Sequence, residues 1–224
     1  MYGRKIDDLK GHAKSQQSLH YNIRHMTPVK TPPSAQRLTR DAWLDAAFRA
    51  VVEAGFDNIR VLVLADKLGV TRGSFYWHFA DHAELVSALL TRWREHEQEQ
   101  NLRLRTDLLA DPRADLEHLL EAALSQAGED LENMRFELAL RGLGRRDTAV
   151  ASMLTEVDQT RMHLFESKFQ RLTNDSKKAS ELASLFYLAL VGSFQALSRP
   201  ANSPQLKNHL KNIIATYLIQ QQAL

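Results

Sequence analysis

The residues with the clearest chemical potential lie in one short segment, residues 71–79, with the sequence TRGSFYWHF. Arg72 can form two parallel hydrogen bonds to O6 and N7 of guanine. Gly73 has no side chain and so permits close approach of the backbone to a base. Tyr76 and His78 can donate hydrogen bonds to phosphate oxygens, contacts that position a protein on DNA without reading its sequence. These residue types have the chemistry for contacts with double-stranded DNA.

The aromatic residues of this segment must divide between interior and surface, because one helical turn cannot bury them all. Phe75 and Phe79 are four residues apart and share one helix face, which we assign to the core. Trp77 has two possible places, against deoxyribose or a thymine methyl group, or over the edge of the core. His78 and His82 have a spacing that can bind metal, but the helix boundary at Ala80-Asp81 disfavours such a site.

Two short helices joined by a tight turn would hold this segment at a surface. Residues 61–68 and 72–78 are predicted as these helices, with Thr71 as the N-cap of the second. Ala65 is small enough for the helices to cross closely, and Gly69 tolerates the positive φ that the turn requires. A longer helix over residues 35–54 should precede them.

Two further residues should define the boundaries around these helices. Gly55 should end the helix of residues 35–54 as its C-cap. Asn58 should be the N-cap of the helix over residues 61–68.

The segment AAFRAVVEAGFDNIRVLVLADKLGVTRGSFYWHFADHAELVSALL resembles the DNA-binding domain of the TetR family of bacterial transcriptional regulators. The shared pattern is E-x-G-F, then L-A-x-x-L-G-V-T-R-G-S-F-Y-W-H-F, then E-L, over about residues 36–95. Leu62 and Val63 depart from it, because many members carry a charged residue just before the L-A pair. We expect these two side chains to pack against the first helix or a neighbour.

The resemblance and the helix geometry together give a set of DNA-contacting residues, of which the N-terminal end of the second short helix should meet the base edges. The set is Arg60, Thr71, Arg72, Gly73, Ser74, Tyr76, Trp77 and His78.

Charge is distributed unevenly along the chain of 224 residues, whose net charge is +2. Residues 1–35 hold six Lys or Arg against two Asp or Glu, whereas residues 81–224 hold 17 against 20. A basic N-terminal third indicates a polyanionic partner. We predict a flexible basic arm over residues 1–34, either a simple extension or a segment that touches DNA phosphates, a DNA-binding domain over 35–80, and a regulatory and dimerisation domain over 81–224.

Helical periodicity continues to the C-terminus, and the predicted fold is all-α: a three-helix helix-turn-helix domain joined by a long helix to a C-terminal helical bundle. The long helix should begin after Asp81 and run to about residue 107. Further helices are predicted to start at Pro112, near Leu131, after Asp147, after Asp175 and at Pro204. The helix near Leu131 should be broken by Gly142 and Gly144. No cysteine is present, so disulfides and thiolate metal sites are excluded.

The helix over residues 176–198 is apolar on more than a narrow stripe and should be buried on two sides. It could be central in the monomer. By the resemblance, it and the last helix would instead form a homodimer. The expected interface is Leu185, Ala189, Gly192, Ser193, Ala196, Leu210, Ile214 and Tyr217. Candidates for lining a ligand pocket are Trp93, Phe136, Glu137, Arg141, His163, Phe165, Tyr187 and Phe194. Glu137 could pair with Arg141 as a surface ion pair or could meet a cationic ligand.

The resemblance implies a cytoplasmic bacterial regulator, most simply a repressor that occupies a palindromic DNA operator as a dimer and is released by a small-molecule effector. The alternatives are a TetR-like activator and a helical ligand-binding or adaptor protein that does not act on DNA. We expect no enzymatic activity, because the sequence has no nucleophile elbow, phosphate loop or metal-binding motif. We also expect no cofactor, no metal and no membrane partner.

Overall fold

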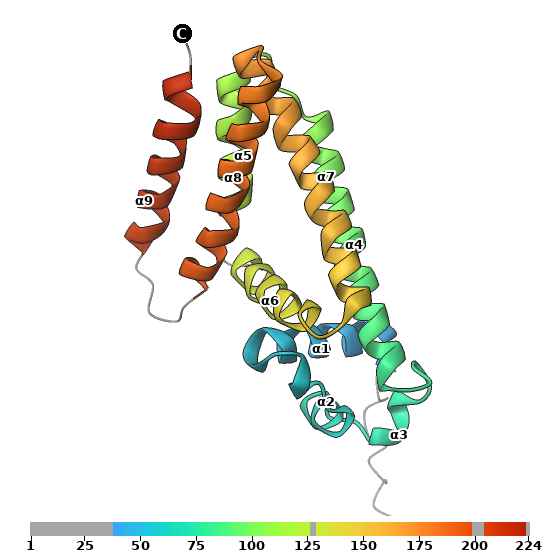
Figure 1. Cartoon of the computed structure of the whole chain (residues 1–224). Helices are drawn as coiled ribbons and strands as arrows, with labels where there is room; N and C mark the ends of the chain where they lie inside the picture. The colour runs from blue at the N-terminus through green and yellow to red at the C-terminus, as the bar shows by residue number, and fades with distance from the viewer. Residues whose placement is uncertain (1–37, 126–128, 199–203, 223–224) are drawn as a thin grey trace, which may run out of the picture. The chain divides into compact units, whose positions relative to one another are not determined.

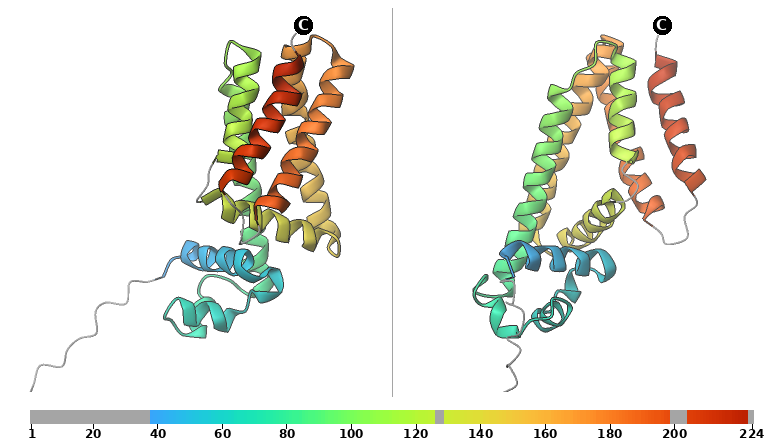
Figure 2. Two further views of the ribbon diagram at one scale, coloured as in Figure 1. Left: turned by 90° about the vertical axis from the view of Figure 1, so that its left-hand side faces the viewer. Right: turned by 180° about the vertical axis from the view of Figure 1, so that it is seen from behind.

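The computed structural model describes residues 38–125, 129–198 and 204–222, and residues 38–224 form one compact unit. The predicted basic arm lies outside the described residues. Within them the regular structure is entirely helical, which confirms the all-α prediction (Figures 1 and 2). The elements are α1 (Arg40–Ala54), a 3₁₀ turn (Phe56–Asn58), α2 (Val61–Lys67), α3 (Arg72–Phe75), α4 (His82–Thr106), α5 (Pro112–Ser125), α6 (Glu129–Gly144), α7 (Thr148–Thr173), α8 (Ser176–Leu197) and α9 (Pro204–Ile214), which continues as a π-helical turn (Ala215–Ile219) and a 3₁₀ turn (Gln220–Gln222).

Local side-chain chemistry sets most helix starts. The carboxylates of Asp81, Asp147 and Asp175 each accept hydrogen bonds from backbone N–H groups in the first turns of α4, α7 and α8. Each bond satisfies a donor that the start of a helix would otherwise leave unpaired. All three caps confirm the sequence predictions.

Several boundaries differ from the predictions. α1 begins at Arg40, with Thr39 as its N-cap, and not at residue 35. Asn58 is not the N-cap of α2; its amide donates to the Ala54 carbonyl, and Arg60 occupies the cap position. Gly142 does not break α6, which continues to Gly144, since one glycine inside a helix costs only about 1 kcal/mol relative to alanine. α3 is shorter than predicted and ends at Phe75, because the chain turns from Tyr76 onward.

Two hydrophobic clusters organise the described chain. The first joins α1–α3 to the start of α4, to α6 and to the start of α7, and includes Trp43, Phe75 and Phe136. The second fills the bundle of α5, α7, α8 and α9 around Phe165, Phe169 and other apolar side chains. α4 and α7 run side by side and connect the regions of the two clusters (Figure 1).

α8 is long and apolar enough to cross a membrane by length and composition alone. In the fold it instead packs against α7 and α9, with Leu182, Ala183 and Phe186 buried in the bundle. α8 thus buries one apolar face in the bundle and leaves Leu185 and Leu188 exposed, so within one chain it is not buried on two sides as predicted.

An ion cluster centred on a buried carboxylate, that of Asp115, ties α5 to α7. Asp115 accepts from the Lys168 Nζ at 2.9 Å and from the Arg171 Nη1 at 2.6 Å, and both Asp115 and Lys168 are buried. Asp115 also accepts from the Leu109 N–H. These bonds fix the connection between α4 and α5 onto α7.

Candidate nucleic-acid interface and ligand cavity

The turn between α2 and α3 has the geometry of a helix-turn-helix. Ala65 is fully buried where the helices meet, and Gly69 has φ +67°, the left-handed conformation predicted for the turn. The N–H of Val70 donates to the Ala65 carbonyl and closes the turn. α2 and α3 are thus held at a fixed angle despite the four-residue length of α3.

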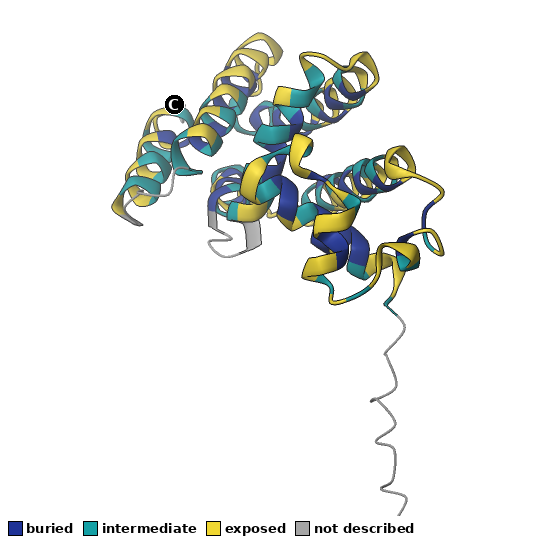
Figure 3. Ribbon diagram, turned by 90° about the horizontal axis from the view of Figure 1, so that it is seen from below, coloured by how far each residue is buried: buried dark blue, intermediate teal, exposed yellow. Residues whose placement is uncertain are grey.

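Core packing fixes the orientation of α3. Phe75 and Phe79 are buried and stacked with ring centroids 5.4 Å apart, and Trp43 of α1 meets Phe75 edge-on at 5.3 Å. The core assignment of both phenylalanines is confirmed. Because one side of α3 is anchored to α1, its opposite side is left at the surface (Figure 3).

The exposed side of α3 and the following turn carries most of the predicted DNA contacts. Thr71, Arg72, Gly73, Tyr76 and Trp77 are exposed, and Trp77 is 75% accessible, the most exposed of the large hydrophobic side chains in the described chain. The Arg72 Nη2 donates to the Tyr76 hydroxyl at 3.2 Å, so the two side chains lie together on this surface. Trp77 therefore does not shield the core.

Other predicted contacts are placed differently. The Ser74 hydroxyl is buried without a hydrogen-bond partner among the described residues, so it does not face the surface where DNA would lie. His78 is only partly exposed. Arg60 is exposed at the start of α2. Leu62 and Val63 are exposed, which corrects the expectation that they pack against the first helix.

The junction between α3 and α4 is held by Arg40, a residue that the sequence reading missed. Its guanidinium lies 4.6 Å from the Phe79 ring centroid, donates to the His78 carbonyl and pairs with Glu84 at 3.1 Å. Glu84 also accepts from the Ala80 N–H, and this bond together with Arg40 lowers the pKa of Glu84 below its ordinary value. The D-x-x-E spacing of residues 81–84 is typical of a helix N-terminus, and it indicates that the Glu84 carboxylate folds back toward the start of α4.

His82 does not form a metal pair with His78. Its Nε2 lies 2.9 Å from the Ile59 carbonyl oxygen, a contact that ties the start of α4 to the residues before α2. The described residues contain no cluster of three or more potential metal ligands.

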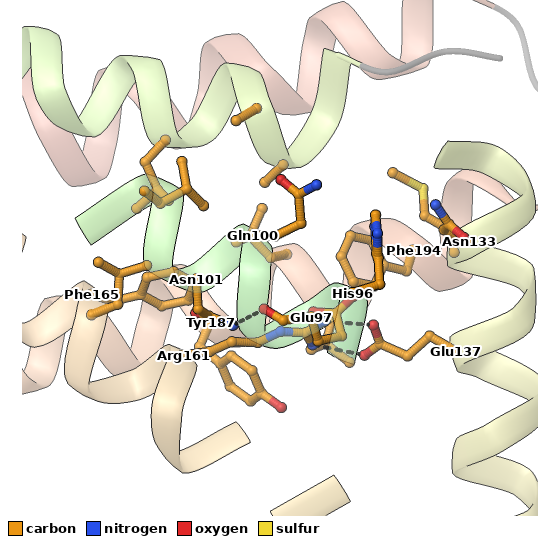
Figure 4. A pocket seen from close by; sticks show the side chains of 18 residues that line it. His96, Glu97, Gln100, Asn101, Asn133, Glu137, Arg161, Phe165, Tyr187 and Phe194 are labelled. Carbon is orange, nitrogen blue, oxygen red and sulfur yellow. Dashed lines mark hydrogen bonds and ion pairs between the residues drawn. The ribbon is translucent and has the colours of Figure 1, made fainter. Parts of the chain in front are cut away.

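A cavity of about 150 Å³ lies among α4–α8 (Figure 4). Four of the predicted pocket residues line it: Glu137, Phe165, Tyr187 and Phe194. Lining residues that the sequence reading missed include His96, Glu97, Gln100, Asn101, Asn133 and Arg161. They were missed because polar residues on long helices look like solvated surface until a neighbouring helix covers them.

The other four pocket predictions are not confirmed by the cavity's lining. Phe136 is buried in the first cluster, stacked on Phe48 of α1 at 4.9 Å. Trp93 belongs to the same cluster and lines an adjacent hollow of about 430 Å³ against α1 and α6. The His163 side chain is 81% exposed, so it points away from the cavity. Arg141 lies behind the lining, bound to Glu137.

A network of charged side chains forms one wall of the cavity. Arg161 of α7 bonds Glu97 of α4 at 2.6 Å and Glu137 of α6 at 2.9 Å. Arg141 bonds Glu137 at 2.7 Å and Asp158 of α7 at 2.8 Å. The pair of Glu137 and Arg141 thus exists but is part of this covered network, not an isolated surface ion pair.

The network determines the protonation of its members. Burial raises the pKa of Glu137, but Arg161 and Arg141 outweigh it and hold that pKa below its usual value, so the carboxyl is ionised at neutral pH. Burial, together with Asp158, raises the pKa of the Tyr187 phenol to about 12. Its hydroxyl therefore stays protonated at neutral pH and accepts from the Arg141 Nη2 at 3.2 Å.

The first three helices share a core and leave one side of the short helix α3 exposed after a glycine turn. A helical bundle with an internal cavity follows. This arrangement is that of a helix-turn-helix transcriptional regulator. Residues 44–89 match the family described as bacterial regulatory proteins, tetR family. The DNA-binding domain of the chain is therefore of the TetR type, and the chain is a DNA-binding transcriptional regulator.

Relatives support this assignment along most of the chain. The regulator AcrR of Shigella flexneri is 29% identical over 151 residues, 62% of this chain and 69% of AcrR. The repressor BepR of Brucella suis is 26% identical over 166 residues, 70% of this chain and 78% of BepR. The crystal structure of a transcriptional regulator from Rhodococcus sp. Rha1 shares the fold with a TM-score of 0.68 and 16% identity, over 84% of this chain and 100% of that one. All three are described as transcriptional regulators or repressors.

Proposed function

We propose that this regulator is a repressor that binds a palindromic operator as a homodimer and leaves it when a small molecule fills the cavity. The observation that carries the proposal is the exposed group of Arg72, Gly73, Tyr76 and Trp77 on a helix whose other side is locked into the core. The name of BepR as a repressor supports the direction of the effect.

The exposed residues of α3 would make two kinds of DNA contact: contacts to bases, which recognise the sequence, and contacts to the DNA backbone, which position the protein. Arg72 would bond guanine, at the N-terminal end of the helix that enters the major groove. Tyr76 would donate to a phosphate, and its present bond to Arg72 would be exchanged for DNA contacts. Trp77, at the surface, would pack on deoxyribose or a thymine methyl group.

DNA binding is tested by fluorescence anisotropy with the duplex that a genomic selection enriches. Arg72→Ala should weaken binding by about 1–3 kcal/mol and relax the preference at one base pair. Tyr76→Phe should weaken binding to all duplexes to a similar extent. Arg105→Ala is the matched control, since Arg105 is an exposed arginine on α4, at the end remote in sequence from α3. Failure to enrich any duplex would exclude the repressor and favour an adaptor function.

Dimer formation would use the apolar side of α8 and α9 that the monomer leaves uncovered. Leu185, Leu188 and Tyr217 are more than half exposed, and Ile213 is 40% exposed. Gly192 is also exposed and would let a partner helix approach closely. Of the predicted interface residues, Ala189, Ala196 and Leu210 are partly exposed.

Two predicted interface residues are placed inward instead. Ser193 is buried and donates to the Ala189 carbonyl, and Ile214 is part of the second hydrophobic cluster. Leu188, which the sequence reading left out, is the most exposed leucine on α8 and takes their place in the proposed interface.

The interface is tested by sedimentation velocity. Leu188→Glu should convert the dimer to a monomer, because it places a charge in the middle of the apolar side. Leu102→Glu is the matched control, since Leu102 is similarly exposed on α4. A dimer that persists in Leu188→Glu would place the interface elsewhere.

Release by an effector requires the effector to bind the operator-free conformation more tightly than the operator-bound one. The cavity wall includes Glu97 on α4, which leads directly from the DNA-binding domain, and Glu137 on α6, next to Phe136, which packs on α1. A molecule that rearranges these side chains can therefore change the position of α1–α3.

A further inference from the structure

The cavity is mainly apolar, with its charge gathered on one wall. Phe165, Tyr187 and Phe194 contribute aromatic rings, and leucine, valine and alanine side chains contribute much of the rest. Among the 18 lining residues, Arg161 is the one permanently charged cation. Its guanidinium is already taken by Glu97 and Glu137 (Figure 4).

The charged wall carries an uncompensated negative charge. Three carboxylates, those of Glu97, Glu137 and Asp158, share the two guanidiniums of Arg141 and Arg161. This leaves one negative charge beside a largely apolar space, where a charge is poorly solvated.

Of the three carboxylates, Glu97 has the fewest cationic partners among the described residues. Glu137 receives hydrogen bonds from both arginines, and both oxygens of Asp158 are bonded by Arg141. Glu97 is paired with one guanidinium among the described residues, that of Arg161 through Oε2. Glu97 is therefore the carboxylate with capacity for a further donor.

We infer that the effector is a small monocation with a compact apolar or aromatic body, and that Glu97 is its counter-ion. This inference rests on the proposed function for its regulatory meaning. A cationic ammonium group bonds a carboxylate more strongly than a neutral donor does. It also gains from the faces of neighbouring aromatic rings. An anion would meet the surplus charge of the wall and compete with Glu97 and Glu137 for Arg161.

The test is isothermal titration of the full-length protein with three probes of nearly equal size: benzylammonium, benzyl alcohol and benzoate. Benzylammonium should bind about tenfold or more tightly than benzyl alcohol, the range expected for one charge-assisted hydrogen bond, and benzoate should bind weakest. Equal affinities for the cation and the alcohol, tighter binding of benzoate, or no binding of benzylammonium would overturn the inference.

Two variants test whether Glu97 is the residue that binds the cationic group. Glu97→Gln should weaken benzylammonium about tenfold while changing benzyl alcohol far less. Glu99→Gln, two residues along α4 with an exposed side chain, should change neither affinity. A uniform loss for all probes in Glu97→Gln would assign the residue a merely structural role and contradict the counter-ion. Should Glu97→Gln not fold, as judged by circular dichroism, the wild-type probe series still decides the charge preference.

The titration contains no DNA, so its outcome is separate from that of the repressor proposal. A protein that prefers the cation through Glu97 but binds no duplex would support the ligand class and refute the repressor. A protein that binds its operator but shows no charge preference would do the reverse.

Discussion

Gly69 offers the sharpest test of how the helix-turn-helix is held. Its φ of +67° is strained for residues with a side chain, yet a Cβ added there would meet no atom within 4 Å. The cost of Gly69→Ala is therefore conformational alone. The left-handed region costs about 1–2 kcal/mol, and the lower entropy of the unfolded alanine chain returns about 0.4–1 kcal/mol. The net loss of unfolding free energy should therefore lie between about 0 and 1.6 kcal/mol.

Thermal unfolding at a fixed protein concentration measures this loss. For a chain of this size, 1 kcal/mol corresponds to a change of about 2–4 °C in Tm. Gly69→Asn should lose less than Gly69→Ala, because asparagine tolerates the left-handed conformation. Gly142→Ala is a control for which the opposite effect is expected. Gly142 lies inside α6, and a Cβ added there would meet no atom within 4 Å. This variant should therefore have a free energy of unfolding about 0.5–1 kcal/mol higher than wild type.

Two results would refute this reasoning about Gly69. A loss above about 3 kcal/mol in Gly69→Ala would require a steric clash, which the open space around the turn excludes. Equal losses in the alanine and asparagine variants would mean that the positive φ is not the cause.

Three further predictions concern ionisable side chains inside the fold. Asp115→Asn should lower the free energy of unfolding by about 3–5 kcal/mol in chemical denaturation, because Lys168 loses its counter-charge. Asp115→Leu combined with Lys168→Met should recover much of that loss. An Asp115→Asn variant as stable as wild type would contradict this prediction. The pKa of the Tyr187 phenol is about 12 in the folded protein, above its usual value near 10. Its contribution to stability is therefore complete below about pH 10 and is lost as the pH rises to 12. A pH titration of tyrosinate absorbance should show an ionisation near pH 12 in wild type that is missing in Tyr187→Phe. Because the pKa of Glu137 is lowered, its stabilisation is present at neutral pH and lost in acid, so the Tm gap between wild type and Glu137→Gln should narrow below about pH 4.

The features predictable from the sequence are those that depend on residues close together in the chain. The Asp81, Asp147 and Asp175 caps bond N–H groups two or three residues away, so the sequence contains both partners. The turn at Gly69 and the inward face of Phe75 and Phe79 are local in the same sense.

The cavity could not be predicted in the same way, because it depends on which helices meet. Phe136 and Glu137 are adjacent, yet one packs on α1 and the other lines the cavity. Arg161 and Glu97 are 64 positions apart, and nothing in their local sequence indicates that they pair. Helical periodicity identifies a residue's face but not the element that covers it.

The first hydrophobic cluster also bears on how regulators of this kind can be recombined. Its members include Phe136, Leu140, Val150, Leu154 and Val157, so α6 and the first half of α7 complete the interior of the operator-reading part. A chimaera cut after α3 or within α4 would expose that interior to a foreign surface. An exchange of operator specificity should therefore carry over the outward residues of α3, or take α1 through α4 together with the facing side chains of α6 and α7. The packing that supports α1–α3 extends 77 residues beyond the predicted boundary at residue 80, to Val157.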